Sequence, residues 1–402
     1  MARMPTPDEA RKLALSPGMP VIRILRTVYD AGNRPLEVQD TVAVADKHQF
    51  RYEVDMRWGP VTARLRIGAC LSLSGRFAQF GQQAAAGLKT WATLDGRADL
   101  VIEDDRSEKD TLRTCLPAVA ARCDLLLGPY STILMRAAGN IAAAQDWLIW
   151  NHGGSGDDVE EAHPGHVVSV LTPTSRYAEP FLHHIAGDGT RELVITSGPG
   201  SFGRQVTDGA EEIARQLGVR AVRATADDQL PPPDVPGEWD LFSAGVFEQD
   251  AELVGKAQRL AVPPCRICAI AAGVRDFGHV VDDPEGVFGI AQWFPGSGTT
   301  AALGPGEDQF VRAYSAATGT LPDYPATQAA AGAVLAVHCA GLAGSTRPEA
   351  LWAAVTSLDT STLFGAFGIN PRSGVQEKHQ TVLVRWTGGK PVPCPPVYQD
   401  LC

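Results

Sequence analysis

Alternating apolar and polar positions predict a pair of long strands near the start of the chain. Residues 20–29 and 36–44 each alternate along their length, and the segment between them, from Asp30 to Pro35, is rich in turn-forming residues. This pattern predicts a β-hairpin. Because an isolated hairpin is only marginally stable in water, it should pack on another element or belong to a larger sheet.

From residue 64 onward the pattern changes to strands and helices in turn. Apolar Leu65, Ile67 and Ala69 alternate with polar or small residues, a glycine-containing polar loop follows at residues 72–76, and residues 82–94 carry an apolar helical stripe. A strand that leads into a helix through a short glycine loop is the unit of an α/β sheet. Ligands of such sheets bind on these loops, at the carboxyl ends of the strands.

The same unit recurs along the chain. We expect strands at residues 99–103, 124–128, 147–150, 167–171, 192–196, 219–225, 240–246, 265–272 and 286–294. We expect helices at residues 108–122, 177–185, 309–317, 326–343 and 348–357, and others that end near residues 144, 217 and 260. Two late strands, at residues 364–369 and 381–386, should complete the second half of the fold.

Two of the loops combine small residues with hydroxyl groups directly after a buried strand. Ser131 and Thr132 follow one strand, and Ser155 follows the next. Backbone amides at a helix N-terminus, together with a hydroxyl, favour a carboxylate or another anion. The alternative is that these serines only cap their helices.

The ordered set of loops resembles the type I periplasmic-binding-protein family, which includes the branched-chain amino-acid and amide receptors. The similar segments are residues 67–81 (Ile-Gly-Ala-Cys-Leu-Ser-Leu-Ser-Gly-Arg-Phe-Ala-Gln-Phe-Gly), residues 128–131 (Gly-Pro-Tyr-Ser) and residues 151–155 (Asn-His-Gly-Gly-Ser). The resemblance covers residues 61–400. It implies an α/β, two-lobed (Venus-flytrap) fold with parallel sheets flanked by helices, which closes around a small ligand.

The resemblance also implies a division into lobes and a set of ligand-binding residues. The first lobe would comprise residues 64–174 and 296–360, and the second residues 175–295 and 361–400. No catalytic residue, cofactor or metal is implied. The expected ligand-binding residues are Phe80, Tyr130, Ser131, Thr132, Gly153, Gly154 and Ser155 in the first lobe, Phe202, Phe247 and Val274 in the second, Trp293 at a crossing between the lobes, and Tyr324.

One departure from the family bears on the ligand. The amino-acid receptors usually place an acidic residue after the strand expected here at 265–272, where it holds the ammonium of the ligand. This chain has Ala271-Ala-Gly-Val-Arg275 there, and the nearest carboxylate is Asp276. Because a buried ammonium without a counter-charge is costly, an amide, a carboxylate or a neutral solute fits better than an unmodified α-amino acid.

The first 57 residues resemble a different protein, the last part of the UTRA effector domain of GntR-type transcription regulators. The similar segments are residues 4–13, 21–30, 34–37 and 46–52, and residues 58–63 form a linker. Either the ancestor was a regulator fused to a receptor, or the chain starts at an internal methionine. The resemblance leaves open a DNA-binding partner chain, a homodimer and a role in transcription regulation. The alternative is that the hairpin is an added element without a function of its own.

A glycine motif in the second half supports a different function. Gly198, Gly200 and Gly203 follow an expected strand and precede an expected helix, with Asp227 and Asp228 further on. This is formally the dinucleotide-binding pattern, so the alternative function is an NAD(P)-dependent enzyme that uses the Gly198–Gly203 loop. Against it, Pro199 stiffens the turn and no catalytic His and Arg pair is evident, while Phe202 fits the glycine-flanked aromatic of the receptor family.

Composition narrows the partners and the compartment. The 402 residues are 44% apolar and carry a net charge of −11, which argues against a general nucleic-acid or anionic-membrane surface. No run of about 18 apolar residues is present, so no membrane span is expected. The N-terminal residues lack the hydrophobic core of a signal peptide, so we expect a cytoplasmic protein, although family members are often exported.

The cysteines and histidines are expected to be structural. Eight cysteines agree weakly with a reducing compartment, Cys115 and Cys123 should be too far apart to bridge, and the Cys265 and Cys268 pair should begin a buried strand. His152, with residues 163 and 166 nearby, is expected to be a solvated loop residue rather than a metal ligand.

Overall fold

A computed structural model describes residues 2–29, 35–44, 64–187, 192–225, 230–235, 237–297 and 300–395. The chain divides into two compact units, Met1–Gly59 and Pro60–Cys402, which are described here one at a time. The expected linker at residues 58–63 and the turn before Pro35 lie outside the described residues.

The N-terminal unit is a small antiparallel sheet with the strand order β1-β2-β3. Its strands are β1 (Ala2–Arg3), β2 (Val21–Tyr29) and β3 (Pro35–Val44), so the predicted hairpin is confirmed. Sequence reasoning missed α1 (Pro7–Lys12). The sequence feature that indicates this helix is a capping box at its start. The Thr6 hydroxyl accepts from the backbone amide of Glu9, and the Glu9 carboxylate accepts from the backbone amide of Thr6.

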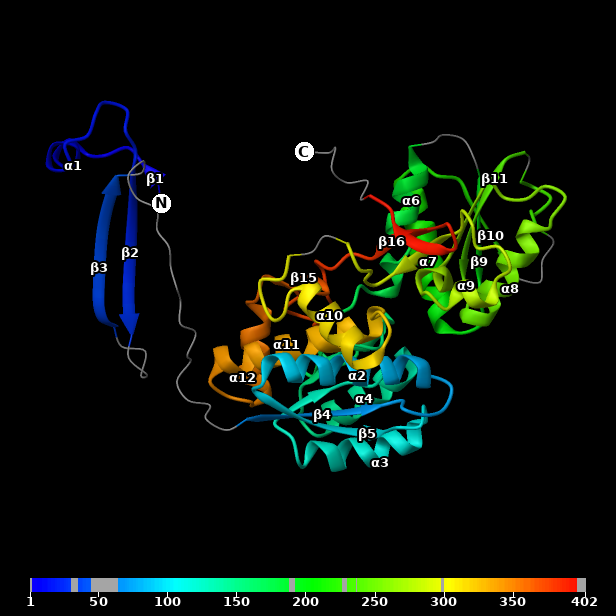
Figure 1. The fold of residues 1–402 in the computed structure, drawn as a ribbon, viewed down its shortest axis with the longest axis horizontal. Coiled ribbons are helices and arrows are strands. Elements are labelled where there is room, and N and C mark those ends of the chain that lie inside the picture. The colour runs from blue at the N-terminus through cyan, green and yellow to red at the C-terminus, as the bar shows by residue number, and fades with distance from the viewer. Residues whose placement is uncertain are drawn as a thin grey trace. The chain divides into compact units, whose positions relative to one another are not determined.

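The larger unit begins with a parallel sheet of strand order β5-β4-β6-β7-β8, which we call the first lobe. Helix α2 covers one face and α3 covers the other (Figure 1), and α4 packs on the same side as α3. The elements are β4 (Leu65–Leu71), α2 (Ala78–Asp95), β5 (Ala98–Asp104), α3 (Lys109–Ala120), β6 (Leu125–Leu127), α4 (Thr132–Ala144), β7 (Ile149–Asn151), α5 (Asp158–Glu161) and β8 (Val167–Ser169).

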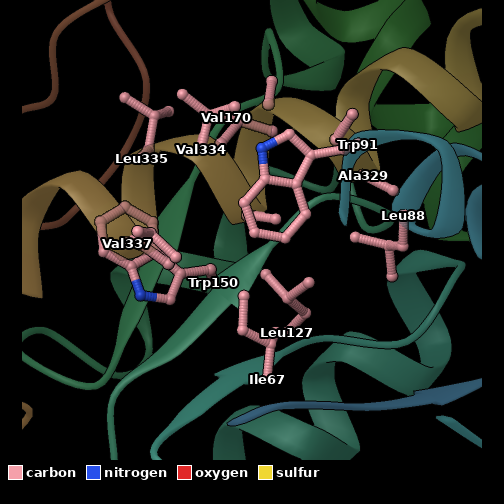
Figure 2. Close-up of a cluster of buried hydrophobic side chains, with 14 of the residues drawn as sticks. Ile67, Leu88, Trp91, Leu127, Trp150, Val170, Ala329, Val334, Leu335 and Val337 are labelled. Carbon is pink, nitrogen blue, oxygen red and sulfur yellow. The ribbon is translucent and has the colours of Figure 1, made fainter. Parts of the chain in front are cut away.

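Three later helices return to the first lobe, namely α10 (Glu307–Thr318), α11 (Tyr324–Ala343) and α12 (Pro348–Thr356). Figure 2 shows side chains from α2, β6, β7 and α11 gathered in one cluster, among them Trp91, Leu127, Trp150 and Val334. Helix α11 is long and apolar enough to cross a membrane, but 78% of its apolar window is buried inside the protein. It is therefore the central core helix of this lobe.

The second lobe is a seven-stranded sheet of order β10-β9-β11-β12-β13-β16-β17. Its first five strands are parallel in the same winding order as those of the first lobe, and β16 joins them antiparallel to β13. The strands are β9 (Glu192–Ser197), β10 (Ala221–Thr225), β11 (Trp239–Ala244), β12 (Arg266–Ala269), β13 (Phe288–Ala291), β16 (Val382–Thr387) and β17 (Lys390–Pro393). The helices are the short 3-10 turn η1 (Thr174–Arg176), α6 (Glu179–Ala186), α7 (Ser201–Gln216), α8 (Phe247–Gln258), the 3-10 turn η2 (Ile270–Gly273) and α9 (Phe277–Val280).

The structure corrects the expectation for residues 364–369. The short strands β14 (Thr360–Thr362) and β15 (Gly365–Phe367) pair only with each other and do not enter the second-lobe sheet. Phe364 and Phe367 are instead buried in the hydrophobic cluster of the first lobe, because burying two aromatic rings there outweighs joining a sheet edge. The strand predicted at residues 381–386 is present as β16.

Three segments carry the chain between the lobes, and a buried hydrogen-bond network joins them. The Gln292 amide donates to the Thr172 carbonyl at 2.9 Å and accepts from the Thr172 amide at 3.1 Å. The Thr172 hydroxyl lies 2.6 Å from Nδ1 of His379, and Nε2 of His379 lies 3.1 Å from the Phe364 carbonyl. Since a carbonyl only accepts, His379 carries its proton on Nε2. Burial lowers the pKa of His379 to about 4, so the ring stays neutral at the hinge.

Candidate ligand-binding site

The first cleft loop follows β4, and carboxylates from the end of β5 hold it in place. The Ser72 hydroxyl donates to Asp105 at 2.7 Å, and Asp105 also accepts from the Ser107 amide at 2.8 Å. The Ser74 hydroxyl donates to Asp104 at 2.7 Å. Burial raises the pKa of Asp105, whose second oxygen has no hydrogen-bond partner among the described residues. This loop is thus shaped by the protein itself before any ligand arrives.

The second loop carries Ser131 and Thr132, and both hydroxyls have backbone partners. Ser131 is the N-cap of α4, with φ at 87°, and its hydroxyl accepts from the Leu134 amide at 3.4 Å. The Thr132 hydroxyl accepts from the Gly156 amide at 3.1 Å. The capping alternative therefore describes Ser131 in this conformation, although its contact is long and a ligand can compete for it, whereas Thr132 links the second loop to the third.

The third loop, after β7, is organised by Asn151. The Asn151 amide oxygen accepts from the amides of Gly153 and Gly154 at 3.1 and 2.8 Å. Its nitrogen donates to the Glu160 carboxyl at 2.5 Å and to the Gly154 carbonyl at 2.6 Å. Burial raises the pKa of Glu160 to about 8. Gly153 also accepts from the Ser131 amide at 2.9 Å, so the second and third loops form one surface.

Aromatic rings of the first lobe form a wall beside these loops. Phe80 stacks on Tyr130 with ring centroids 4.6 Å apart, and Phe77 meets the same tyrosine edge-on at 6.0 Å. Tyr324 lies 6.5 Å from Phe80, and its hydroxyl is 2.9 Å from the Tyr130 hydroxyl. We call Phe77, Phe80, Tyr130 and Tyr324 the aromatic wall. It joins three expected site residues that are far apart in the sequence.

A third tyrosine faces the wall from the first crossing. Tyr177 accepts from the Gln292 amide at 2.8 Å and packs edge-on against Phe202 of the second lobe at 5.9 Å. Burial raises the pKa of Tyr177, while the neighbouring Ser155 side chain opposes this rise. Burial is also the main cause of the raised pKa of Tyr130 and Tyr324, and Tyr177 adds to both. The three phenols therefore form one group.

The second lobe presents a less polar surface. Asp250 of α8 accepts from the Ser243 hydroxyl at 2.6 Å, the Gly245 amide at 2.7 Å and the Ala271 amide at 3.0 Å. Burial raises the pKa of Asp250 to about 6. This carboxylate fixes the ends of β11 and β12, while the loop that reaches Val274 offers small apolar side chains.

Direct contacts join the two lobes on both sides of this region. On one side Arg275 of the second lobe donates to the Pro322 carbonyl at 2.9 Å and pairs with Asp323 of the first, while Gln79 contacts Asp276. On the other side Arg136 of the first lobe donates to the Ser201 hydroxyl at 2.9 Å. Asp276 and Asp323 thus already have partners of their own.

Four of the expected site residues are buried or pack in hydrophobic clusters. Trp293 is at its crossing, but its side chain packs in the first-lobe core with 1% exposed. Phe247 packs against a cluster of the second lobe, and Val274 and Gly154 are buried. Sequence reasoning missed Phe77, Tyr177 and Gln292. Their positions could have indicated them, since Phe77 lies beside the first loop and Tyr177 and Gln292 lie beside the crossings.

The expectation for His152 is wrong. Its side chain is completely buried in the first lobe, and burial lowers its pKa to about 4, so it is neutral. It directly follows β7, and its Cβ faces the core helix α11, where a Cβ on Gly332 would lie 3.7 Å away. Among the described residues there is no cluster of three or more His, Cys, Asp or Glu able to hold a metal ion.

Comparison with known proteins agrees with this architecture. The family model described as "Periplasmic binding protein" matches residues 64–390, and a model of the UTRA domain matches residues 1–49. The chain therefore belongs to the periplasmic binding protein family, as a two-lobed protein of type I fold. Curated protein sequences give no match.

Solved structures share the fold at low sequence identity. The leucine-binding protein LivK of Thermotoga maritima is 15% identical, with a TM-score of 0.69, covering 82% of this chain and 98% of its own. A solute-binding protein from Rhodopseudomonas palustris, in complex with 3,4-dihydroxybenzoic acid, is 14% identical, with a TM-score of 0.68 and coverage of 82% and 96%. A substrate-binding protein from Desulfitobacterium hafniense, in complex with Leu, is 16% identical, with a TM-score of 0.69 and coverage of 82% and 99%.

Proposed function

We propose that residues 64–395 form a non-catalytic solute-binding protein whose lobes close on a small carboxylate with an aromatic or branched apolar tail and without a free ammonium. The observation that carries this proposal is the asymmetry of the cleft. Phe80, Tyr130 and Tyr324 offer rings and phenol groups on one side, and the Ala271–Val274 loop offers no carboxylate on the other.

The charges around the cleft favour a ligand that has no ammonium group. Two carboxylates beside the Ala271–Val274 loop and the aromatic wall already have partners: Asp323 pairs with the Arg275 guanidinium, and Asp276 contacts the neutral Gln79 amide. A ligand ammonium would have to displace Gln79 or Arg275 from these carboxylates, or be buried without a counter-charge, which costs several kcal/mol. The related structures with 3,4-dihydroxybenzoic acid and with Leu define the two ligand classes that this argument separates.

Matched ligand pairs test the proposal directly. Leucine and isocaproate differ by one amino group, as do phenylalanine and hydrocinnamate, so titration calorimetry on each pair isolates the ammonium. We expect the acid without the amino group to bind at least about tenfold more tightly, together with hydroxybenzoates. Tighter binding of the amino acids would overturn the proposed ligand class while leaving the binding function intact.

The packing of the glycine motif offers another reason for two of the glycines that suggest the alternative, an NAD(P)-dependent enzyme. A Cβ on Gly203 would lie 2.8 Å from the Ala244 carbonyl, and one on Gly198 would lie 3.1 Å from Cα of Gly245. Close packing against β11 therefore accounts for both glycines without a phosphate. Fluorescence titration with NADH should give no binding, and saturable binding would favour the enzyme.

The link to transcription regulation is a separate proposal, supported by the match of residues 1–49 to the UTRA domain. A DNA-binding partner chain or a homodimer would be its physical basis. Sedimentation velocity of the full chain, with and without ligand, should reveal a ligand-dependent dimer if the chain itself is the dimerising partner. A constant monomer would contradict that form of the proposal. The cytoplasmic location also stays a prediction.

A further inference from the structure

Two cysteines of the first lobe approach each other closely. Cys70 belongs to β4 and Cys115 to α3, 45 positions later, and their sulfur atoms lie 2.8 Å apart. Cys70 is completely buried and Cys115 is half-buried. Because the sulfurs of a disulfide lie about 2.05 Å apart, a small movement of the side chains would bring these two sulfurs to bonding distance.

We propose that Cys70 and Cys115 are a redox-active pair that forms a disulfide when a small-molecule disulfide is present. The Cys115 thiolate attacks one sulfur of the oxidant, forming a mixed disulfide and releasing one thiol. The Cys70 sulfur then attacks the Cys115 sulfur; the Cys70 proton passes to the departing thiolate, which leaves as the second thiol. The protein loses two hydrogens, and the oxidant is reduced to two thiols.

The surroundings assign these roles. Cys115 is the accessible member of the pair, so it meets the oxidant first. The sulfur–sulfur contact lowers the pKa of Cys115, whereas the same contact and burial raise the pKa of Cys70, with Asp105 and Glu103 adding to the rise. The thiolate, which is the reactive form, therefore develops on Cys115, the more accessible of the two cysteines.

The bond would tie the first cleft loop to its support. Cys70 lies two residues before Ser72, and α3 follows the segment whose Asp105 already accepts from the Ser72 hydroxyl. The disulfide would thus add a covalent link beside an existing hydrogen bond. In a reducing compartment the pair would remain as two thiols.

Cys123 provides a matched control. A Cβ on Gly68 would lie 2.8 Å from the Cys123 sulfur, so this third cysteine packs over Gly68 rather than over Cys70. Gly68 and Cys70 are about 6.6 Å apart along the strand. Cys123→Ser should therefore leave the redox behaviour of the pair unchanged, while Cys115→Ser and Cys70→Ser should abolish it.

Thiol counting on the full chain decides the matter. The protein is equilibrated with oxidised glutathione or with dithiothreitol, then denatured, alkylated with N-ethylmaleimide and weighed by mass spectrometry. The oxidised protein should carry two fewer labels, and its digest should contain a linked Cys70–Cys115 peptide. Its melting temperature should rise by roughly 3 °C or more over the reduced protein.

The same experiment can overturn the proposal. An equal number of labels in both samples, or a stable glutathione adduct at Cys115 without a linked peptide, would exclude the pair. If Cys70→Ser does not fold, Cys115→Ser decides alone, because the half-buried position tolerates a hydroxyl. Loss of the two-label difference in Cys123→Ser would also contradict the assignment.

Discussion

The two lobes wind their five parallel strands in the same order, yet they hold their cleft loops with different chemistry. The first lobe uses several buried polar groups, including Asp105, Asn151 and Glu160, and offers hydroxyls and aromatic rings to the cleft. The second lobe concentrates its support in Asp250 and offers a small, apolar loop. Because the strand order is the same, the different contributions of the two lobes to the site come from individual side chains.

The largest expected effect comes from removing the support of the second lobe. Asp250→Ala leaves the Ser243 hydroxyl and the amides of Gly245 and Ala271 without their partner, so it should cost about 3 to 5 kcal/mol of unfolding free energy. Asp105→Ala in the first lobe should cost about half as much, since one Asp105 oxygen has no partner among the described residues. Urea unfolding of both variants measures the difference. Equal losses would show that the lobes share their support evenly.

The next effect depends on pH and concerns the first lobe. The pKa of Glu160 is raised to about 8 in the fold, so between about pH 4.5 and 8 the unfolded chain releases a proton that the folded chain keeps. Stability from this group therefore falls as pH rises through that window. Glu160→Gln should raise stability by about 2 to 4 kcal/mol at pH 8 and by almost nothing at pH 4.

Melting curves of the Glu160→Gln variant and the unmodified protein across this range provide the check. The amide of the variant retains an oxygen to accept from Asn151, so the third loop should keep its shape. A stability gain that is the same at both ends of the range would mean that Glu160 is charged in the folded protein.

The fold could be predicted from the sequence more fully than the site. The alternation of apolar residues in strands and their helical spacing in helices are local patterns in the sequence. The strand and helix units from β4 to β13 and the N-terminal hairpin could therefore be predicted in order. The segment around Phe364 was misplaced because its alternation does not say which sheet it joins. His152 was misjudged because its polar neighbours suggested a solvated loop, whereas its side chain, just after the end of β7, is completely buried. Tyr177 needed the crossing geometry, which only tertiary structure supplies.

The contribution of the aromatic wall to binding should exceed that of the second lobe. Phe80→Ala removes the ring that stacks on Tyr130, and should weaken the tightest-binding carboxylate of the matched pairs by about tenfold to a hundredfold. Phe247→Ala should change affinity less than about threefold, since this ring packs against the second-lobe cluster. Calorimetry on both variants measures the ratio. A larger loss from Phe247 would move the centre of the site to the second lobe.

The smallest effect tests whether the phenol groups act as hydrogen-bond partners or only as rings. Tyr324→Phe removes one hydroxyl of the pair that meets at 2.9 Å and keeps the ring near Phe80. One lost hydrogen bond is worth about 1 kcal/mol, so the affinity for the carboxylate should fall about fivefold. Tyr177→Phe is the matched comparison at the crossing, where Gln292 loses one hydrogen-bond partner and keeps its two bonds with Thr172. If Tyr324→Phe binds as well as the unmodified protein, the phenols serve the wall only through packing, and the polar end of the ligand must lie against the serine loops instead.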